Sequence, residues 1–353
     1  LPICSVGSLY TIGIETQRYE AYMKHAFILN PEHGTNIALM GMASMHQVDA
    51  DYGNKHYDAN EKNVYAQLMF ETNMQELHNL ATGLSLNYDY PGAEDKEAAT
   101  GAYAQYTYNL HNRLVAMAGL RADHSSLYGN FITPRVHVKY VLNQTLSLRL
   151  SAGKGYRSAH PLAEHHSLLM SGRQLIIDPI RQESAWNYGM SSTLYIPLFG
   201  RTLRLNAEYY HTHFIRQMIV DYDSDPAVIH ITNLSGRSRS NTLQVDVTYP
   251  LLRGLDITTA WRLNDVKTTY GDRLLRQPLT SRYKGLLTAS YKTPLELWQF
   301  DITLQLNGGR RMPTPYTTTQ GLPSWDERYK GYEQLNAQIT RFFRHWSIYA
   351  GGE

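Results

Sequence analysis

The amino-acid sequence predicts an all-β fold in which antiparallel strands form a barrel that spans a membrane. Three observations support this prediction: apolar and polar residues alternate along most of the chain, the alternating segments are long, and the connections between them are short and long in turn. The alternation continues for about 9 to 15 residues in many segments, whereas an ordinary strand has about 5 or 6 residues. A tilted strand that crosses a bilayer needs about 9 to 11 residues, so these segments are long enough to cross one.

The alternation has the period of a β-strand and not that of a helix. Leu255 and Ile257 share one face of their segment, while Asp256 and Arg262 share the other. The pattern is clearest at positions 79–89, 146–151, 203–210, 243–249, 255–264 and 298–307. Faces that carry so many charged residues are not a protein core. An antiparallel sandwich also alternates, so this pattern alone does not choose between a sandwich and a barrel.

The lengths of the connections favour the barrel. Short connections are expected at 30–35, 75–76, 110–113, 142–145, 197–201, 250–254, 294–295 and 344–345. Long ones are expected at 48–60, 90–96, 124–130, 157–181, 222–227, 267–280 and 310–330. Short turns on one side and long loops on the other are typical of outer-membrane barrels, and a complete bacterial barrel has an even number of strands, whereas this chain has about 17. We therefore expect residues 1–353 to form a single partial barrel domain that is truncated at both ends.

Aromatic residues lie near the ends of the apolar runs, where amphipathic rings prefer the boundary between headgroups and hydrocarbon. The alternative is that aromatic residues are simply favoured in strands. The residues concerned are Tyr88, Tyr140, Tyr209, Tyr249, Trp261, Trp298 and Trp346.

The composition excludes several classes of protein and of site. Charged residues make up 18% of the chain, below the roughly 25% of an ordinary soluble domain. The net charge of +2 argues against a nucleic-acid partner. Cys4 is the single cysteine, so an intramolecular disulfide and a cysteine-based metal site are excluded. We find no catalytic arrangement, no phosphate-binding loop and no resident cofactor or metal site.

Several motifs point to one family. Positions 153–162 read Gly-Lys-Gly-Tyr-Arg-Ser-Ala-His-Pro-Leu, and 178–184 read Asp-Pro-Ile-Arg-Gln-Glu-Ser at the start of the next strand. Together with Ile-Thr-Asn-Leu-Ser-Gly at 231–236, they resemble the C-terminal barrel of TonB-dependent outer-membrane receptors. The segments 78–90 and 336–341 are similar to receptors of Bacteroidetes-type bacteria.

The resemblance implies which further parts the whole protein has, where it is located and what it does. It implies a barrel of 22 strands with an N-terminal plug, which is absent here, and contact with the TonB complex through that plug. It also implies an outer-membrane location, with membrane lipid and lipopolysaccharide as neighbours. The implied activity is active transport, not catalysis: import of a ferric siderophore or haem, with cobalamin as an alternative and glycans after it.

Candidate ligand-binding residues lie on the predicted outer rim. The histidines of the 157–181 connection lie where haem receptors of this family carry an axial histidine, although the strand end reads Tyr-Arg-Ser-Ala and not their Phe-Arg-Ala-Pro. Rim arginines can attract an anionic ferric chelate or lipopolysaccharide phosphates. The alternative for each residue is an ordinary solvated rim position. The candidates are Tyr156, Arg157, His160, His165, His166, Arg173, Arg310 and Arg311.

Two other classes of protein stay open. An outer-membrane barrel enzyme needs a catalytic set at strand-compatible spacing, which we do not find. A soluble β-sandwich binding protein needs the apolar side chains to pack against a second layer. Our prediction therefore depends on lipid, and not protein, covering the apolar faces. By the same parity His211 and His213 lie on the lipid side with Leu205 and Tyr209, and we expect no metal site there.

Overall fold

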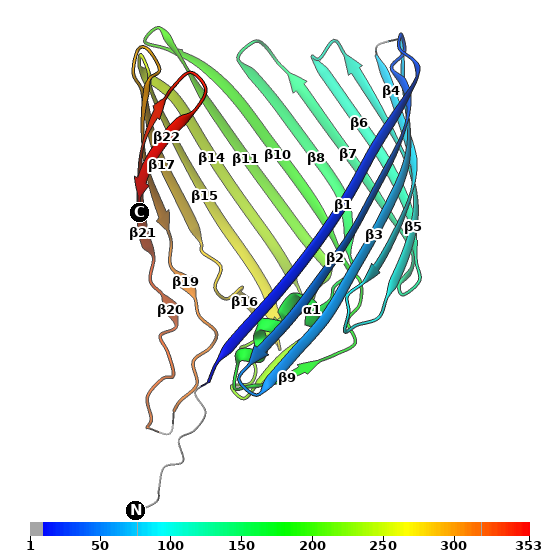
Figure 1. Cartoon of the computed structure of the whole chain (residues 1–353), viewed down its shortest axis with the longest axis vertical. Helices are drawn as coiled ribbons and strands as arrows, with labels where there is room; N and C mark the ends of the chain where they lie inside the picture. The colour runs from blue at the N-terminus through cyan, green and yellow to red at the C-terminus, as the bar shows by residue number, and fades with distance from the viewer. Residues whose placement is uncertain (1–9, 76, 319) are drawn as a thin grey trace, which may run out of the picture.

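The computed structural model describes residues 10–75, 77–318 and 320–353. A single sheet of 17 strands curves into a barrel wall, as predicted. Figure 1 shows the tilted strands following one another around this wall. Its strands are β1 (Ile12–Asn30), β2 (Thr35–Tyr52), β3 (Lys55–Met74), β4 (His78–Tyr90), β5 (Glu97–Leu110), β6 (Leu114–Ser125), β7 (Gly129–Val141), β8 (Leu146–Arg157), β10 (Glu183–Leu198), β11 (Arg201–Arg216), β14 (Ser238–Leu252), β15 (Leu255–Tyr270), β16 (Arg273–Arg276), β17 (Tyr283–Lys292), β18 (Trp298–Asn307), β21 (Tyr332–Phe342) and β22 (Ser347–Gly352).

The wall is an up-and-down meander in which neighbouring strands are antiparallel. Each long strand pairs with the long strand before it, from β1 with β2 to β21 with β22. The short β16 pairs only with the end of β15. Within the described residues, β1 and β22 each have one paired neighbour, so the sheet is open between them, as Figure 1 shows.

The apolar face of the wall points outward and is uncovered. On β4, Leu84 is 59% exposed and Leu86 is 46% exposed, whereas Ser85 between them is 8% exposed. The same holds for Ile302 on β18, which is 53% exposed. No second sheet or helical layer of the described residues packs on these side chains, which excludes the sandwich. This confirms the predicted transmembrane barrel fold.

The polar face lines the inside of the wall, where cross-strand hydrogen bonds connect it. Arg121 Nη2 on β6 donates to Asp123 at 2.6 Å and to Ser85 on β4 at 2.7 Å. Gln67 Nε2 on β3 donates to the Tyr103 hydroxyl on β5 at 3.2 Å. Each such bond contributes about 1 kcal/mol net, so together they stiffen the inner surface.

The short connections of the described residues lie at one end of the wall, as predicted, and position 76 of the 75–76 connection lies outside the described residues. Two of the predicted long connections are turns. The strands β2 and β3 continue through 48–60 and pair up to Tyr52 and Lys55, around a turn in which Gly53 has a φ of 66°. Likewise, β6 and β7 extend the wall to Ser125 and Gly129. Polar residues at 48–60 indicated a loop, but they alternate with apolar residues that are buried.

In the β2–β3 hairpin the apolar and polar side chains exchange faces along the length of the strands. On the outer face of β3, Val64 is exposed, and the positions nearer the turn on the same face include Lys62 and His56. On the inner face, Ala59 and Tyr57 are both 4% exposed. The change marks the level at which lipid gives way to water: beyond it the apolar side faces inward and the charged side faces outward.

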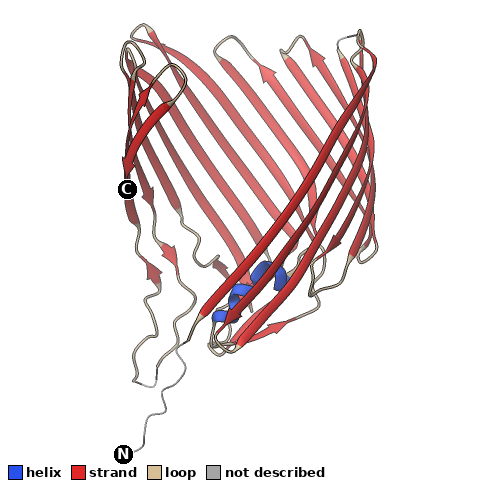
Figure 2. Ribbon diagram, viewed as in Figure 1, coloured by secondary structure: helices blue, strands red, loops and turns tan. Residues whose placement is uncertain are grey.

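The long loops at the other end contain short elements that the sequence analysis did not predict. Between β8 and β10 lie α1 (Pro161–His165), a 3-10 helix η1 (His166–Met170) and β9 (Gln174–Ile177). Figure 2 shows these helices at the long-loop end of the barrel. The strand β9 joins β12 (Met218–Asp221) and β13 (Val228–Asn233) in a small sheet, and β19 (Arg310–Arg311) pairs with β20 (Arg328–Tyr329). No helix among the described residues has the length and apolar character to cross a membrane.

The helices α1 and η1 cover the inner face of the projecting hairpin. Leu162 and Leu169 pack against a buried cluster formed by the two strands of the hairpin. This cluster consists of Val48, Ala50, Tyr52, Tyr57 and Ala59. The loop after β8 is therefore a folded part of the barrel mouth.

Candidate functional site

The predicted rim residues lie at the end of the barrel where the long loops fold together. His160 immediately precedes α1 and lies between two carboxylates: its Nε2 is 2.9 Å from Asp89 and its Nδ1 is 3.3 Å from Glu94. These two contacts, with Asp89 the stronger, raise the pKa of His160 to about 10 in spite of its burial. Glu94 also accepts a hydrogen bond from the Leu162 amide at 2.5 Å. His160 is thus a cation that fixes α1 to the β4–β5 connection.

The other two histidines of this loop are packed against its surroundings. His166 stacks on Tyr57 with ring centroids 4.8 Å apart and planes 4° apart. Its Nδ1 is hydrogen-bonded to the Tyr52 hydroxyl at 2.7 Å. Burial lowers the pKa of His165 below its ordinary value. The structure therefore places the three histidines in three different environments.

Tyr156 and Arg157 end β8 and contact side chains of the wall and the loop. The Arg157 guanidinium contacts Glu183 at 2.6 Å and Glu164 at 2.7 Å, which connects β8 to β10 and to α1. The Tyr156 ring lies 3.9 Å from the Phe131 ring, centroid to centroid.

Arg311 joins three loops through a buried ion pair. Its two terminal nitrogens each lie 2.8 Å from a carboxylate oxygen of Asp223, in the β12–β13 connection. Its guanidinium also lies over Tyr270 at the end of β15, 5.8 Å from the ring centroid. Asp223 accepts two further hydrogen bonds from Thr314, at 2.7 Å and 2.9 Å. Burial opposes ionisation, but Arg311 and Thr314 hold the pKa of Asp223 below its usual value.

The remaining predicted arginines make aromatic contacts. Arg173 lies 5.5 Å from the Trp325 ring centroid and donates a hydrogen bond to the Tyr222 carbonyl at 3.2 Å. Arg310 lies 5.9 Å from the ring centroid of Tyr332. The predicted arginines and histidines thus hold the mouth together, and the structure does not gather them around one cavity.

A cavity on the inner face of the wall contains basic residues that the sequence analysis missed. It has a volume of about 530 Å³ and spans β3 to β8. Arg121, Arg135 and Lys154 line it, together with one acidic residue, Glu71, and polar Gln105. Arg135 donates to Gln105 at 2.6 Å. The alternation in β7 places Arg135 on the inner face, and this parity was the signal that could have identified it.

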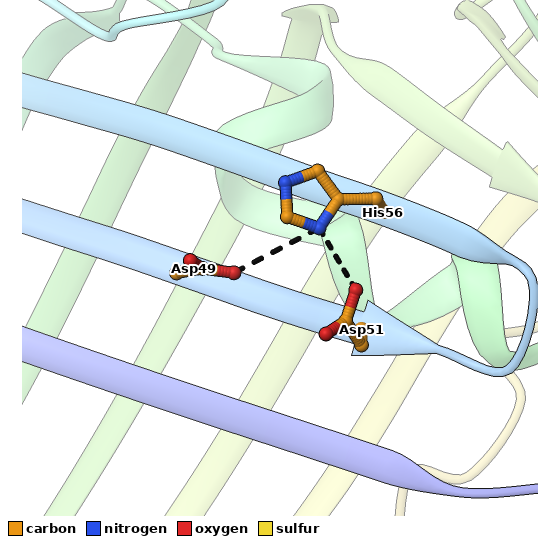
Figure 3. Close-up of side chains that lie close together, drawn as sticks. All are labelled: Asp49, Asp51 and His56. Carbon is orange, nitrogen blue, oxygen red and sulfur yellow. Dashed lines mark hydrogen bonds and ion pairs between the residues drawn. The ribbon is translucent and has the colours of Figure 1, made fainter.

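One cluster of potential metal ligands lies on the outer face of the β2–β3 hairpin. Figure 3 shows Asp49 and Asp51 of β2 pointing toward His56 of β3. The Nδ1 atom of His56 lies 2.8 Å from Asp51 and 3.7 Å from Asp49. The ligand atoms lie within 4.8 Å of one another, and all three residues are exposed. The imidazole and the carboxylates pair with one another, and an exposed pair of this kind contributes little to stability.

His211 and His213 lie on the outward face of β11, where their direct partners on β10 are Tyr188 and Trp186. His211 stacks on Tyr188 with centroids 6.3 Å apart. Its Nδ1 is hydrogen-bonded to Asn241 at 2.7 Å. These contacts belong to an aromatic patch on the outer surface of the barrel.

Comparison with known proteins adds family and fold to this description. The family model described as TonB dependent receptor-like, beta-barrel, matches residues 8–353. No curated protein matches the chain. A solved mutant of the ferric enterobactin receptor PfeA from Pseudomonas aeruginosa has a TM-score of 0.73 and 12% identity, over 96% of this chain and 56% of that one.

Other solved structures show the same likeness. The siderophore receptor PirA from Acinetobacter baumannii has a TM-score of 0.73 and 10% identity, over 96% of this chain and 58% of that one. The copper transporter OprC has a TM-score of 0.73 and 12% identity, over 96% of this chain and 61% of that one. The chain thus spans little more than half the length of these proteins.

Proposed function

Because the chain belongs to the TonB-dependent receptor family, we propose that the full-length protein imports a ferric siderophore across the bacterial outer membrane. Uptake takes place by TonB-coupled transport, in which the TonB complex acts through a plug outside the present sequence. The protein is a transport receptor and not an enzyme. Structural neighbours named as a ferric enterobactin receptor and a siderophore receptor support this choice of substrate.

The basic inner cavity is the observation that carries the proposal. Neither Arg135 nor Lys154 forms an ion pair within the part of the chain that the structure describes, and both line the cavity. Ferric chelates with several deprotonated oxygen ligands are commonly anionic. A cationic surface attracts such a ligand and raises its local concentration.

The folded mouth supports the binding of a bulky ligand before transport. The ion pair of Arg311 with Asp223 and the contacts of His160 with Asp89 and Glu94 hold four connections in fixed positions. A binding site on preordered loops loses less conformational entropy when its ligand arrives.

Haem and cobalamin remain the alternatives, but no observation favours them over a siderophore. A histidine that ligates haem iron must be neutral and free at one ring nitrogen. His160 is a cation with both ring nitrogens in contact with carboxylates. His166 is hydrogen-bonded to Tyr52 through Nδ1 and stacks on Tyr57. Among the three histidines, this requirement therefore leaves His165, whose pKa burial lowers, and the Nε2 atom of His166.

The test is uptake by a deletion strain that carries the full-length gene or its variants. Wild-type protein restores uptake of radioactive iron from an anionic ferric siderophore, and the double variant Arg135→Ala with Lys154→Ala reduces it. Lys139→Ala is the matched control, because Lys139 is an inner-face cation of β7 that lies outside the cavity. Restored growth on haem or cobalamin alone, with no siderophore uptake, overturns the assignment.

A further inference from the structure

A second feature, independent of transport, lies on the outer surface at the short-turn end of the barrel. On β21, Leu335 and Ile339 continue the apolar outward face, with exposures of 58% and 38%. The next position on this face is Arg341, which pairs directly with Trp298 of β18. The lipid-facing stripe therefore ends in a positive charge.

Aromatic rings hold this charge against the wall. The Arg341 guanidinium lies 4.6 Å from the ring centroid of Trp298 and 5.2 Å from that of Phe343. Trp346 stacks on Phe343 with centroids 4.1 Å apart and planes 13° apart. Contacts of this kind with two rings hold a guanidinium in place and leave it able to donate hydrogen bonds.

Among the described residues, Arg341 forms no ion pair with a carboxylate. The segment 335–352 contains no aspartate or glutamate, and Arg344 adds a second positive charge in the adjoining turn. Glu296 in the β17–β18 connection is the acidic residue of the neighbouring turn, and it is not paired with Arg341.

The position of Arg341 relative to the membrane surface indicates which anionic group it can bind. Short turns of outer-membrane barrels face the periplasm, and aromatic residues mark the level of the headgroups there. Trp298, Phe343 and Trp346 place Arg341 at this level on the face that contacts lipid. The anionic group available at that position is the phosphodiester of a phospholipid, which a planar guanidinium binds with two parallel hydrogen bonds.

We propose that Arg341, flanked by Trp298 and Phe343, binds the phosphodiester of a phospholipid in the periplasmic leaflet and prefers an anionic headgroup. Phosphatidylglycerol brings no cation to the site. The ammonium of phosphatidylethanolamine, in contrast, is repelled by Arg341. The site holds the outer surface near β18 and β21 at a fixed depth in the membrane.

The test is native mass spectrometry of the full-length receptor in detergent with equal amounts of phosphatidylglycerol and phosphatidylethanolamine. Wild-type protein retains phosphatidylglycerol preferentially, and Arg341→Ala reduces its retention about five-fold, the effect of one basic residue near an anionic headgroup. Trp298→Leu reduces retention in the same direction, because the guanidinium loses one of its rings. Arg344→Ala is the matched control and keeps most of the retention.

Four results overturn the proposal. Three of them are equal retention by wild type and Arg341→Ala, equal losses in Arg341→Ala and Arg344→Ala, and equal retention of the two lipids by the wild type. Displacement of the lipid by inorganic phosphate also overturns it, because the site then binds any phosphate and not a headgroup. Heat-dependent gel mobility of each variant shows that its barrel is folded. Since the readout is lipid retention, its failure leaves the transport proposal untouched.

Discussion

Replacing Asp223 with asparagine should release the loops of the barrel mouth from one another. The Asp223 side chain is 1% exposed and that of Arg311 is 21% exposed, so their ion pair is largely shielded from water. Asparagine keeps an oxygen that accepts the hydrogen bonds of Thr314, but its amide group faces the guanidinium as a second donor. Arg311 is then a buried cation without a counter-ion.

The magnitude follows from the burial of the pair. Removing one partner of a buried ion pair costs about 3 to 5 kcal/mol. The partial exposure of Arg311 and the retained Thr314 contacts place Asp223→Asn at the lower limit, about 3 kcal/mol. At about 1.4 kcal/mol per factor of ten, the loops open roughly a hundred times more often.

Hydrogen exchange measures this opening directly. The Thr314 amide donates to Asp223 at 2.7 Å, so peptides that contain it report on the closed mouth. We expect their exchange to become roughly a hundred times faster in Asp223→Asn, while wall strands keep their protection. Asp225→Asn is the control, because Asp225 is exposed in the same connection and bonds only locally, to the Ala227 amide.

A double variant separates the ion pair from a general disturbance. Arg311→Leu combined with Asp223→Asn removes the unpaired charge, so the two effects together should be smaller than their sum. Unchanged exchange at Thr314 in Asp223→Asn, or equal acceleration in Asp225→Asn, would show that the ion pair does not hold the mouth closed.

Two further predictions concern the α1 loop and the outer surface. The pKa of His160 is raised from about 6.5 to about 10, so its contribution to stability is complete below the lower value and is lost as the pH rises through the upper one. Protection in 161–170, which is the exchange rate relative to the intrinsic rate at each pH, should therefore fall between these pH values in the wild type and stay constant in His160→Gln. A fall in protection that persists in the variant contradicts the assignment. On β18, Ile302→Arg should cost about 2 to 4 kcal/mol of folding stability in lipid, because it places a charge on the lipid side. Gln338→Arg, on the inner face opposite Asp301, should cost far less; equal losses in refolding titrations would mean that the two faces are not distinguished by lipid.

The wall could be predicted from the sequence because the residues of each strand alone determine which side chains face outward and which face inward. Leu84 and Leu86 face outward and Ser85 inward whatever the neighbouring strands are, since the strand period fixes the faces. The hairpin at 48–60 was predicted to be a loop because its apolar face is covered by α1 and η1. The sequence pattern within the hairpin does not reveal this covering layer. The single-domain boundaries and the Bacteroidetes-type resemblance stay predictions.

The site was harder to predict because its contacts join distant positions. Arg311 and Asp223 are 88 positions apart, and nothing near either residue indicates the other. The predicted arginines and histidines lie at the mouth, but their role in ligand binding stays a prediction, because their partners decide whether they are free to meet a ligand. Arg135 was overlooked because a single inner-face cation in an alternating strand looks like any other polar residue.

The reversed hairpin of β2 and β3 has a consequence for engineering this barrel. Loops of such receptors are natural targets for exchange or shortening, yet the segment after β8 shields Tyr52 and Tyr57 from water. Removal of this segment exposes an apolar patch on the part of the hairpin that projects beyond the bilayer. Neighbouring receptors can associate through such a patch. The hairpin and this loop must therefore be transplanted together.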